Sequence, residues 1–127
     1  MTRRSERVAE AIRRLASEII HGQLRDPRIR GLVTVTKVET TPDLRLAKIY
    51  YTAMCDGKKR ELLGRGLKSA KGYIRRRIAE ELKLRYAPEI LMKIDEVVEH
   101  SQKIDKILHK LKNEADDESN RKDSAGD

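Results

Sequence analysis

Residues 33–52 read VTVTKVETTPDLRLAKIYYT, a stretch with the pattern of two β-strands joined by a turn. The first part, residues 33–38, is dense in the β-branched residues that favour strands. Thr41-Pro42-Asp43 is typical of a turn, because Pro fixes its own φ and Asp can bond the backbone just ahead of it. Residues 44–52 then alternate, with Ala47, Ile49 and Tyr51 on one face. The pattern predicts an antiparallel hairpin.

A helix is predicted before the hairpin, from about Ser5 to His21, with Gly22 ending it. Its apolar residues recur at spacings of three, four and one, as on one face of an amphipathic helix: Val8, Ile12, Leu15, Ala16, Ile19 and Ile20. The opposite face carries Arg3, Arg4, Arg7, Arg13 and Arg14. This face could equally be an ordinary solvated one. Asp26-Pro27-Arg28 predicts a turn between helix and hairpin.

A second apolar stripe follows the hairpin and predicts helix from about Lys59 to Leu84. Its members advance by three or four: Leu63, Leu67, Ala70, Ile74, Ile78 and Leu82. Three glycines, Gly64, Gly66 and Gly72, interrupt it, and each costs about 1 kcal/mol relative to Ala in a helix interior. We therefore expect two helices that meet at a kink near Ala70-Lys71-Gly72.

After Pro88, residues 90–95 predict a third strand with Ile90, Met92 and Ile94 facing inward. A last amphipathic helix follows, and its apolar residues are Val97, Ile104, Ile107, Leu108 and Leu111. From Asn113 onward apolar residues almost disappear, which is typical of a disordered acidic tail. The sequence thus predicts one α+β domain over residues 1–112, a three-stranded sheet with helices packed on one face, and a tail over residues 113–127.

The net charge limits the classes of partner that the protein could bind. The chain has 29 Lys and Arg against 21 Asp and Glu, a net charge of +8. The segment from Asn113 holds six acids and two basic residues, a net of −4, which leaves +12 on residues 1–112. Such a charge attracts RNA, DNA or an anionic membrane. No stretch is apolar enough to cross a membrane or to act as a signal peptide, so we expect a cytoplasmic protein.

Nothing in the sequence predicts catalysis. Cys55 is the single cysteine and has no nearby His, and the three histidines lack metal-ligand spacing. The segment Gly64-Arg65-Gly66 lacks the preceding strand and the Lys-Ser/Thr ending of a nucleotide-binding loop. Adjacent carboxylates such as Glu80-Glu81 do not face one another. We expect no enzyme, no cofactor, no metal and no small-molecule substrate.

The basic residues around the kink are the candidate RNA-binding site. A helix that starts again near Gly72 would expose backbone N–H groups among cationic side chains, which favours phosphate. The candidates are Arg65, Lys68, Lys71, Gly72, Arg75 and Arg76, together with Arg3, Arg4 and Arg7, while Ala70 and Gly72 would form the kink itself. The alternative is a solvated helix face. With only four tyrosines as aromatic residues, we expect recognition of RNA shape and phosphates more than base stacking.

Several segments together resemble the ribosome-binding factor A family across about residues 3–111. Those that carry the resemblance are residues 7–20, Asp26-Pro27-Arg28, residues 33–38, Pro42-Asp43-Leu44, residues 47–50, residues 70–75, Leu84-Arg85, Pro88-Glu89, and Asp95 with Ile104 and Leu108. The sequence departs from the family pattern at Met92, where an aromatic residue is common, and at Ile90, where Leu is usual.

The resemblance implies a KH-like fold of type II in which Ala70-Lys71-Gly72 replaces the usual Gly-x-x-Gly loop. It further implies a monomeric, non-enzymatic assembly factor that binds the free small (30S) ribosomal subunit. Such a factor supports late maturation and 5′-end processing of 16S rRNA and matters most for growth in the cold. Composition alone leaves two alternatives open: a generic basic nucleic-acid-binding protein, and a protein-interaction adaptor without ribosome specificity.

Overall fold

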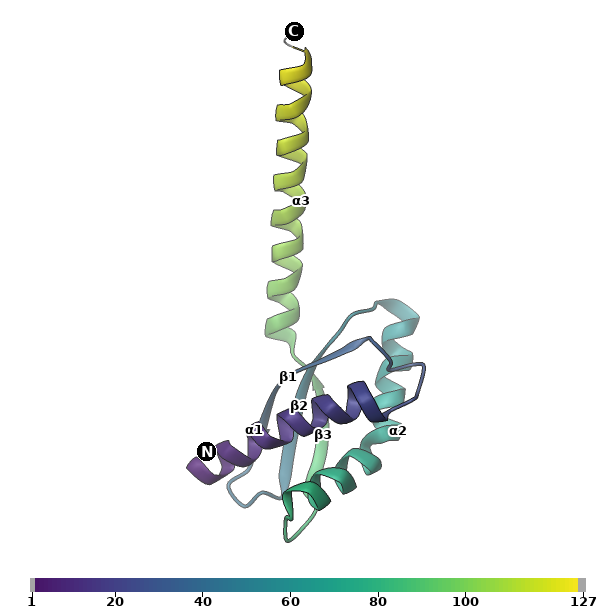
Figure 1. Ribbon diagram of the computed structural model, residues 1–127, viewed down its shortest axis with the longest axis vertical. Coiled ribbons are helices and arrows are strands. Elements are labelled where there is room, and N and C mark those ends of the chain that lie inside the picture. The colour runs from purple at the N-terminus through teal and green to yellow at the C-terminus, as the bar shows by residue number, and fades with distance from the viewer. Residues whose placement is uncertain (1, 126–127) are drawn as a thin grey trace. The chain divides into compact units, whose positions relative to one another are not determined.

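A computed structural model of the chain describes residues 2–125, and their side chains as far as Glu118 (Figure 1). The order of elements is α1 (Arg3–Glu18), the π-helical turn η1 (Ile19–Gln23), β1 (Val33–Thr40), β2 (Leu46–Ala53), α2 (Gly57–Leu82), β3 (Glu89–Ile94) and α3 (Glu96–Ala125). The chain divides into two compact units, one that ends at Asp95 and one that begins at Glu96.

The three strands form one mixed sheet in the order β1-β2-β3. The predicted hairpin is confirmed: β1 and β2 are antiparallel, with Val38 opposite Ile49. β3 lies parallel to β2 on its other side, with Ile90 opposite Ala47. The β1–β2 register shifts between Val35 and Lys37, which is the mark of a β-bulge. β2 is therefore the central strand, and both of its edges are paired.

One face of this sheet, together with α1 and α2, encloses the core. The inward residues of β2 are Ala47, Ile49 and Tyr51, and all are buried. Burial of a side chain such as Ile49 contributes about 1.5–3 kcal/mol. The helices supply six more of the large buried side chains: Ile12, Ile19, Leu63, Leu67, Ile74 and Ile78. Each of these six was placed on an apolar stripe by its sequence spacing, so the helix faces were predicted correctly.

The ends of α1 differ from the prediction. The helix begins at Arg3 because Thr2 and Ser5 form a reciprocal cap, in which Ser5 N–H donates to Thr2 Oγ1 and Thr2 N–H donates to Ser5 Oγ. Gly22 does not end the helical run. The chain continues through Gly22 as the π-helical turn η1, and Leu24 N–H donates to Ile19 O at its end.

The turn at Asp26-Pro27-Arg28 is present and packs on α2. Arg28 N–H donates to Asp26 Oδ1 over 2.9 Å, and the Arg28 side chain pairs with Asp26. The hydrogen bond from the Arg28 side chain lowers the pKa of the Asp26 carboxyl. Gly66 makes this packing possible, because a Cβ there would stand 2.9 Å from Ile29 Cγ1. Gly66 is therefore a close-approach glycine, a role that its sequence context did not reveal.

The kink at Ala70-Lys71-Gly72 is a bend within one helix. α2 is α-helical without interruption from Gly57 to Leu82. Figure 1 shows its axis changing direction between the teal and the green half. Gly72 is exposed, and a Cβ added there would meet nothing within 4 Å. The two helices that we expected to meet at a kink are thus one continuous bent helix, and no second helix N-terminus with free N–H groups exists near Gly72.

Arg75 joins α2 to the segment that leads into β3. Its Nε donates to Pro88 O and its Nη2 donates to Ala87 O, each over 3.1 Å. Pro88 is buried, so the two carbonyl groups are held in place by the packing around them. Arg75 thus has a structural role. The sequence alone indicated only a cationic residue and could not show these two contacts.

The second unit consists of α3. Its backbone is helical to Ala125, although we expected a domain over residues 1–112 and disorder from Asn113. The physical reason for the difference is that residues 96–125 contain neither Gly nor Pro, the two strongest helix breakers. A disordered tail over residues 113–127 stays a prediction for the protein in solution, and residues 126 and 127 lie outside the described range.

Gly66→Ala should destabilise the fold and Gly72→Ala should not. At residue 66 the new Cβ would press on Ile29 and Arg28, and overpacking of this kind costs about 1–3 kcal/mol. At residue 72 the space is open, so the better helix propensity of Ala should add up to about 1 kcal/mol. Urea unfolding followed by circular dichroism compares the two variants. Equal stabilities would contradict the close approach at Gly66.

Arg75→Gln should lower the free energy of unfolding by about 1–2 kcal/mol, because two carbonyl groups lose a charged donor. Arg76→Gln is the matched control. Arg76 is exposed and makes no hydrogen bond to the backbone among the described residues, so its replacement should change stability by less than about 0.5 kcal/mol. Thermal melts of both variants test this, and identical melting temperatures would disprove the structural role of Arg75.

Candidate nucleic-acid interface

The predicted cations of α2 gather on its exposed side. Arg65, Lys68 and Arg76 are exposed, and Lys71 is half-buried. Arg65, Lys68, Gly72 and Arg76 advance by three, four and four, which places them on one helix face. At 1.5 Å per residue this face is about 17 Å long. We call these four residues the α2 basic face.

Gly72 leaves a gap in the middle of the α2 basic face. With no side chain and nothing within 4 Å of its Cβ position, the helix backbone is accessible there between Lys68 and Arg76. A phosphate group could approach α2 more closely at Gly72 than at any residue with a side chain. The gap offers access and not hydrogen-bond donors, because the helix is continuous across it.

Arg76 and Arg65 are held loosely, in contrast to Arg75. The Arg76 guanidinium lies 5.6 Å from the centre of the Tyr73 ring. Arg65 pairs with Glu61 over 3.0 Å, and both side chains are about two-thirds exposed. A surface ion pair of this kind contributes little to stability and is readily exchanged. Lys68, Lys71 and Arg76 have no ion pair with a described residue. These side chains are therefore free to meet an anion.

The predicted cations of α1 form a second group at a distance from the first. Arg3, Arg4 and Arg7 are exposed, whereas Arg13 and Arg14 both pair with Glu10. Tyr73 Oη donates to Gln23 Oε1 over 2.6 Å, so Gln23 marks where the helical run from α1 meets α2 near Gly72. Arg3 is twenty residues earlier, about 30 Å along a helix. The candidate site predicted from sequence is thus two separate surfaces.

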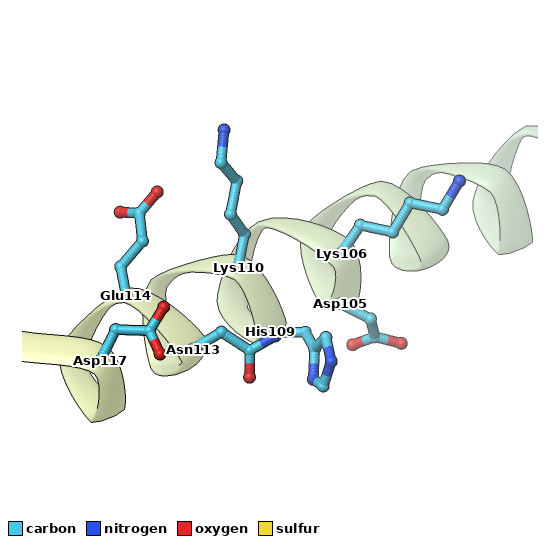
Figure 2. Close-up of a pocket in the computed structure, with 7 residues that line it drawn as sticks. All are labelled: Asp105, Lys106, His109, Lys110, Asn113, Glu114 and Asp117. Carbon is cyan, nitrogen blue, oxygen red and sulfur yellow. The ribbon is translucent and has the colours of Figure 1, made fainter. Parts of the chain in front are cut away.

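The described surface also has hollows away from these cations. Figure 2 shows one along α3, and every side chain that lines it comes from that single helix: Asp105, Lys106, His109, Lys110, Asn113, Glu114 and Asp117. Among residues 2–125, no group of three His, Cys, Asp or Glu side chains could hold a metal ion. In the same range no helix is long and apolar enough to cross a membrane. Cys55 is half-buried and packs at the edge of the core.

Comparison with known proteins finds relatives that match most of the chain. The sequence profile of the family described as ribosome-binding factor A matches residues 4–108. Ribosome-binding factor A of Geobacter sulfurreducens is 46% identical over 114 residues, which cover 90% of this chain and 96% of that protein.

Two structures share the fold. A candidate ribosome binding factor A from Thermotoga maritima, solved by NMR, is 35% identical with a TM-score of 0.63, covering 71% of this chain and 85% of that one. A homology model of the Thermus thermophilus ribosome binding factor A, fitted into a cryo-EM map of a 30S complex with that factor, is 23% identical with a TM-score of 0.56, covering 68% of this chain and 90% of that one.

These structural likenesses agree with the KH-like α+β arrangement of one mixed sheet and two covering helices. The profile match covers the first unit from residue 4 to its end at Asp95, and the identity to the Geobacter protein extends over 90% of the chain. This chain belongs to the ribosome-binding factor A family.

Proposed function

We propose that this protein is a non-enzymatic assembly factor that binds the free small (30S) ribosomal subunit through its 16S rRNA. It acts as a monomer in the cytoplasm, supports late maturation and 5′-end processing of that rRNA, and matters most for growth in the cold. Family membership supports the ribosomal partner, as does the Thermus thermophilus relative, which was fitted into a map of a 30S complex. The α2 basic face is the observation in this chain that carries the proposal.

The α2 basic face suits a structured RNA. Double-helical RNA is recognised largely by its shape and its phosphate and 2′-hydroxyl groups, for which cations on a firm scaffold are sufficient. Arg65, Lys68 and Arg76 stand on one helix whose inward side is fixed by Leu67, Ile74 and other buried residues. Gly72 lets the RNA backbone come close between two of these cations. This face therefore supplies both attraction and fit.

Binding alone is enough for an assembly role. A protein that binds one arrangement of the rRNA more tightly than its competitors shifts the population toward that arrangement by the difference in binding free energy. No bond in the RNA has to be made or broken by the protein. Processing of the 5′ end would then be performed by a separate nuclease acting on the favoured arrangement.

Lys68→Glu with Arg76→Glu should weaken binding to small subunits without unfolding the protein, since both side chains are exposed and lie off the core. If two phosphate contacts are lost, the negative slope of log affinity against log salt should become flatter by about 1.4–1.8. Titration of labelled protein with purified small subunits at several salt concentrations measures this.

Lys58→Glu with Lys59→Glu is the control for that experiment. It makes the same change in charge at the exposed start of α2, where acidic residues suit the helix dipole. This variant should lose less affinity for small subunits than Lys68→Glu with Arg76→Glu, and its salt slope should stay closer to that of the parent. If the two pairs lose the same affinity, only net charge matters, and the generic nucleic-acid-binding alternative is favoured over a specific α2 basic face.

Deletion of the gene should cause small subunits and unprocessed 5′ ends of 16S rRNA to accumulate, more strongly in the cold. Density-gradient profiles and primer extension at two temperatures test this, and the purified protein should sediment with free small subunits and not with large ones. Equal sedimentation with all RNA-containing fractions would support the generic alternative. Sedimentation with none, together with binding that is insensitive to salt, would support an adaptor.

A further inference from the structure

Two turns that are distant in sequence lie side by side at one end of the sheet. Residues 41–45 join β1 to β2, and residues 83–88 join α2 to β3. Each turn contains a left-handed residue, Leu44 with φ of 59° and Lys83 with φ of 50°. Glu89 N–H donates to Arg45 O over 2.7 Å, which ties the two turns together. Their side chains therefore share one surface.

Tyr86 presents an exposed aromatic ring on this surface, and two guanidinium groups gather on it. Tyr86 is 55% exposed. The chain has only four tyrosines and neither Phe nor Trp, and Tyr86 is the one of the four that is exposed. Arg45 lies 5.0 Å from the centre of the ring and Arg85 lies 5.4 Å from it. Both distances are within the range of cation–π attraction. The Tyr86 ring is thus in contact with both guanidinium groups.

Neither guanidinium is neutralised. Arg45 and Arg85 have no ion pair with a carboxylate among the described residues. Asp43, on the same turn, accepts hydrogen bonds from the Thr41 hydroxyl and from Arg45 N–H, so its carboxylate is engaged in the turn itself. The Thr41 hydroxyl is the main cause that lowers the pKa of the Asp43 carboxyl. The two guanidinium groups are therefore exposed and form no ion pair with a described residue, although the Asp43 carboxylate lies near enough to Arg45 to attract it electrostatically.

The turn that carries Arg85 and Tyr86 is held in place by hydrogen bonds to the rest of the fold. Arg75 donates to the carbonyl groups of Ala87 and Pro88, directly after Tyr86, and Pro88 is buried. Thr40 Oγ1 donates to Ser5 O over 3.0 Å, which places the basic start of α1 at the same end of the sheet. Groups held in position before binding lose less conformational entropy when a ligand arrives.

We propose that Arg45 and Arg85, held on Tyr86, form a clamp for a phosphate of the RNA strand. The inference rests on the proposed function and adds a second contact region to the α2 basic face. A planar guanidinium presents paired N–H donors that match phosphate oxygens. Because the ring already carries the two guanidinium groups, the clamp takes phosphate and not an inserted base. Arg76 lies seven residues before Lys83, so RNA leaving the α2 basic face reaches this turn after about 10 Å.

The clamp is tested with Arg45→Gln plus Arg85→Gln in the full chain, using purified small subunits and a 16S rRNA transcript as probes. We expect an approximately tenfold loss of affinity at low salt, and a log-log salt slope whose magnitude is smaller by about 0.7–0.9, as for the loss of one phosphate contact. Tyr86→Leu, which removes the ring, should lose part of this affinity, and Tyr86→Phe, which keeps the ring, should lose less of it. Lys58→Gln plus Lys59→Gln is the control for charge alone.

Each result decides one proposal separately. If the parent binds small subunits and the double Arg variant binds with the parent's affinity and slope, the clamp is refuted while the proposed function stands. If the parent binds the transcript but not the subunit, the proposed function fails, and the transcript data still decide the clamp. Losses equal to those of the lysine control would also refute the clamp, because they would show a dependence on total charge only.

Discussion

The central strand β2 sets the constraint on which the first unit depends. Both edges of β2 are paired, and its inward residues Ala47, Ile49 and Tyr51 must be covered. Helices α1 and α2 cover them from the same side, so both helices turn their apolar stripes toward one face of the sheet. The basic residues of these helices therefore lie mainly on the solvent-exposed faces. The α2 basic face is a consequence of core formation as much as of the charge itself.

The periodic parts of this arrangement could be predicted from the sequence. Alternation in residues 33–52 gave the hairpin, and the three-and-four spacing of residues 63–82 gave the buried stripe of α2. The glycines in that stripe correctly indicated a bend. They did not indicate that the helix continues through it, because propensity gives the local cost of Gly72 and not the tertiary support that offsets it.

The features that escaped prediction are contacts between residues distant in the chain. Gly66 approaches Ile29, Arg75 reaches Ala87 and Pro88, and Arg45 meets Tyr86. None of these pairs has a periodic signature, and each depends on how a turn packs against another part of the fold. For the same reason, the sequence placed Arg3 and Arg76 in one candidate site, although the length of the helical run separates them. The family resemblance supplied the ribosomal partner, which charge could not have distinguished from other polyanions.

The parallel pairing of β3 with β2 has a consequence for the order of folding. The hairpin closes over a few residues, whereas β3 can pair with β2 only after the whole of α2 has been laid across the sheet. Contacts that close a long loop form late, since the chain loses entropy before it gains them. The carbonyl groups that Arg75 binds, and the turn that carries Tyr86, belong to that late-closing segment. A chain interrupted before Glu89 would still hold the arginines and lysines of both basic surfaces, yet it would lack the strand that fixes their spacing.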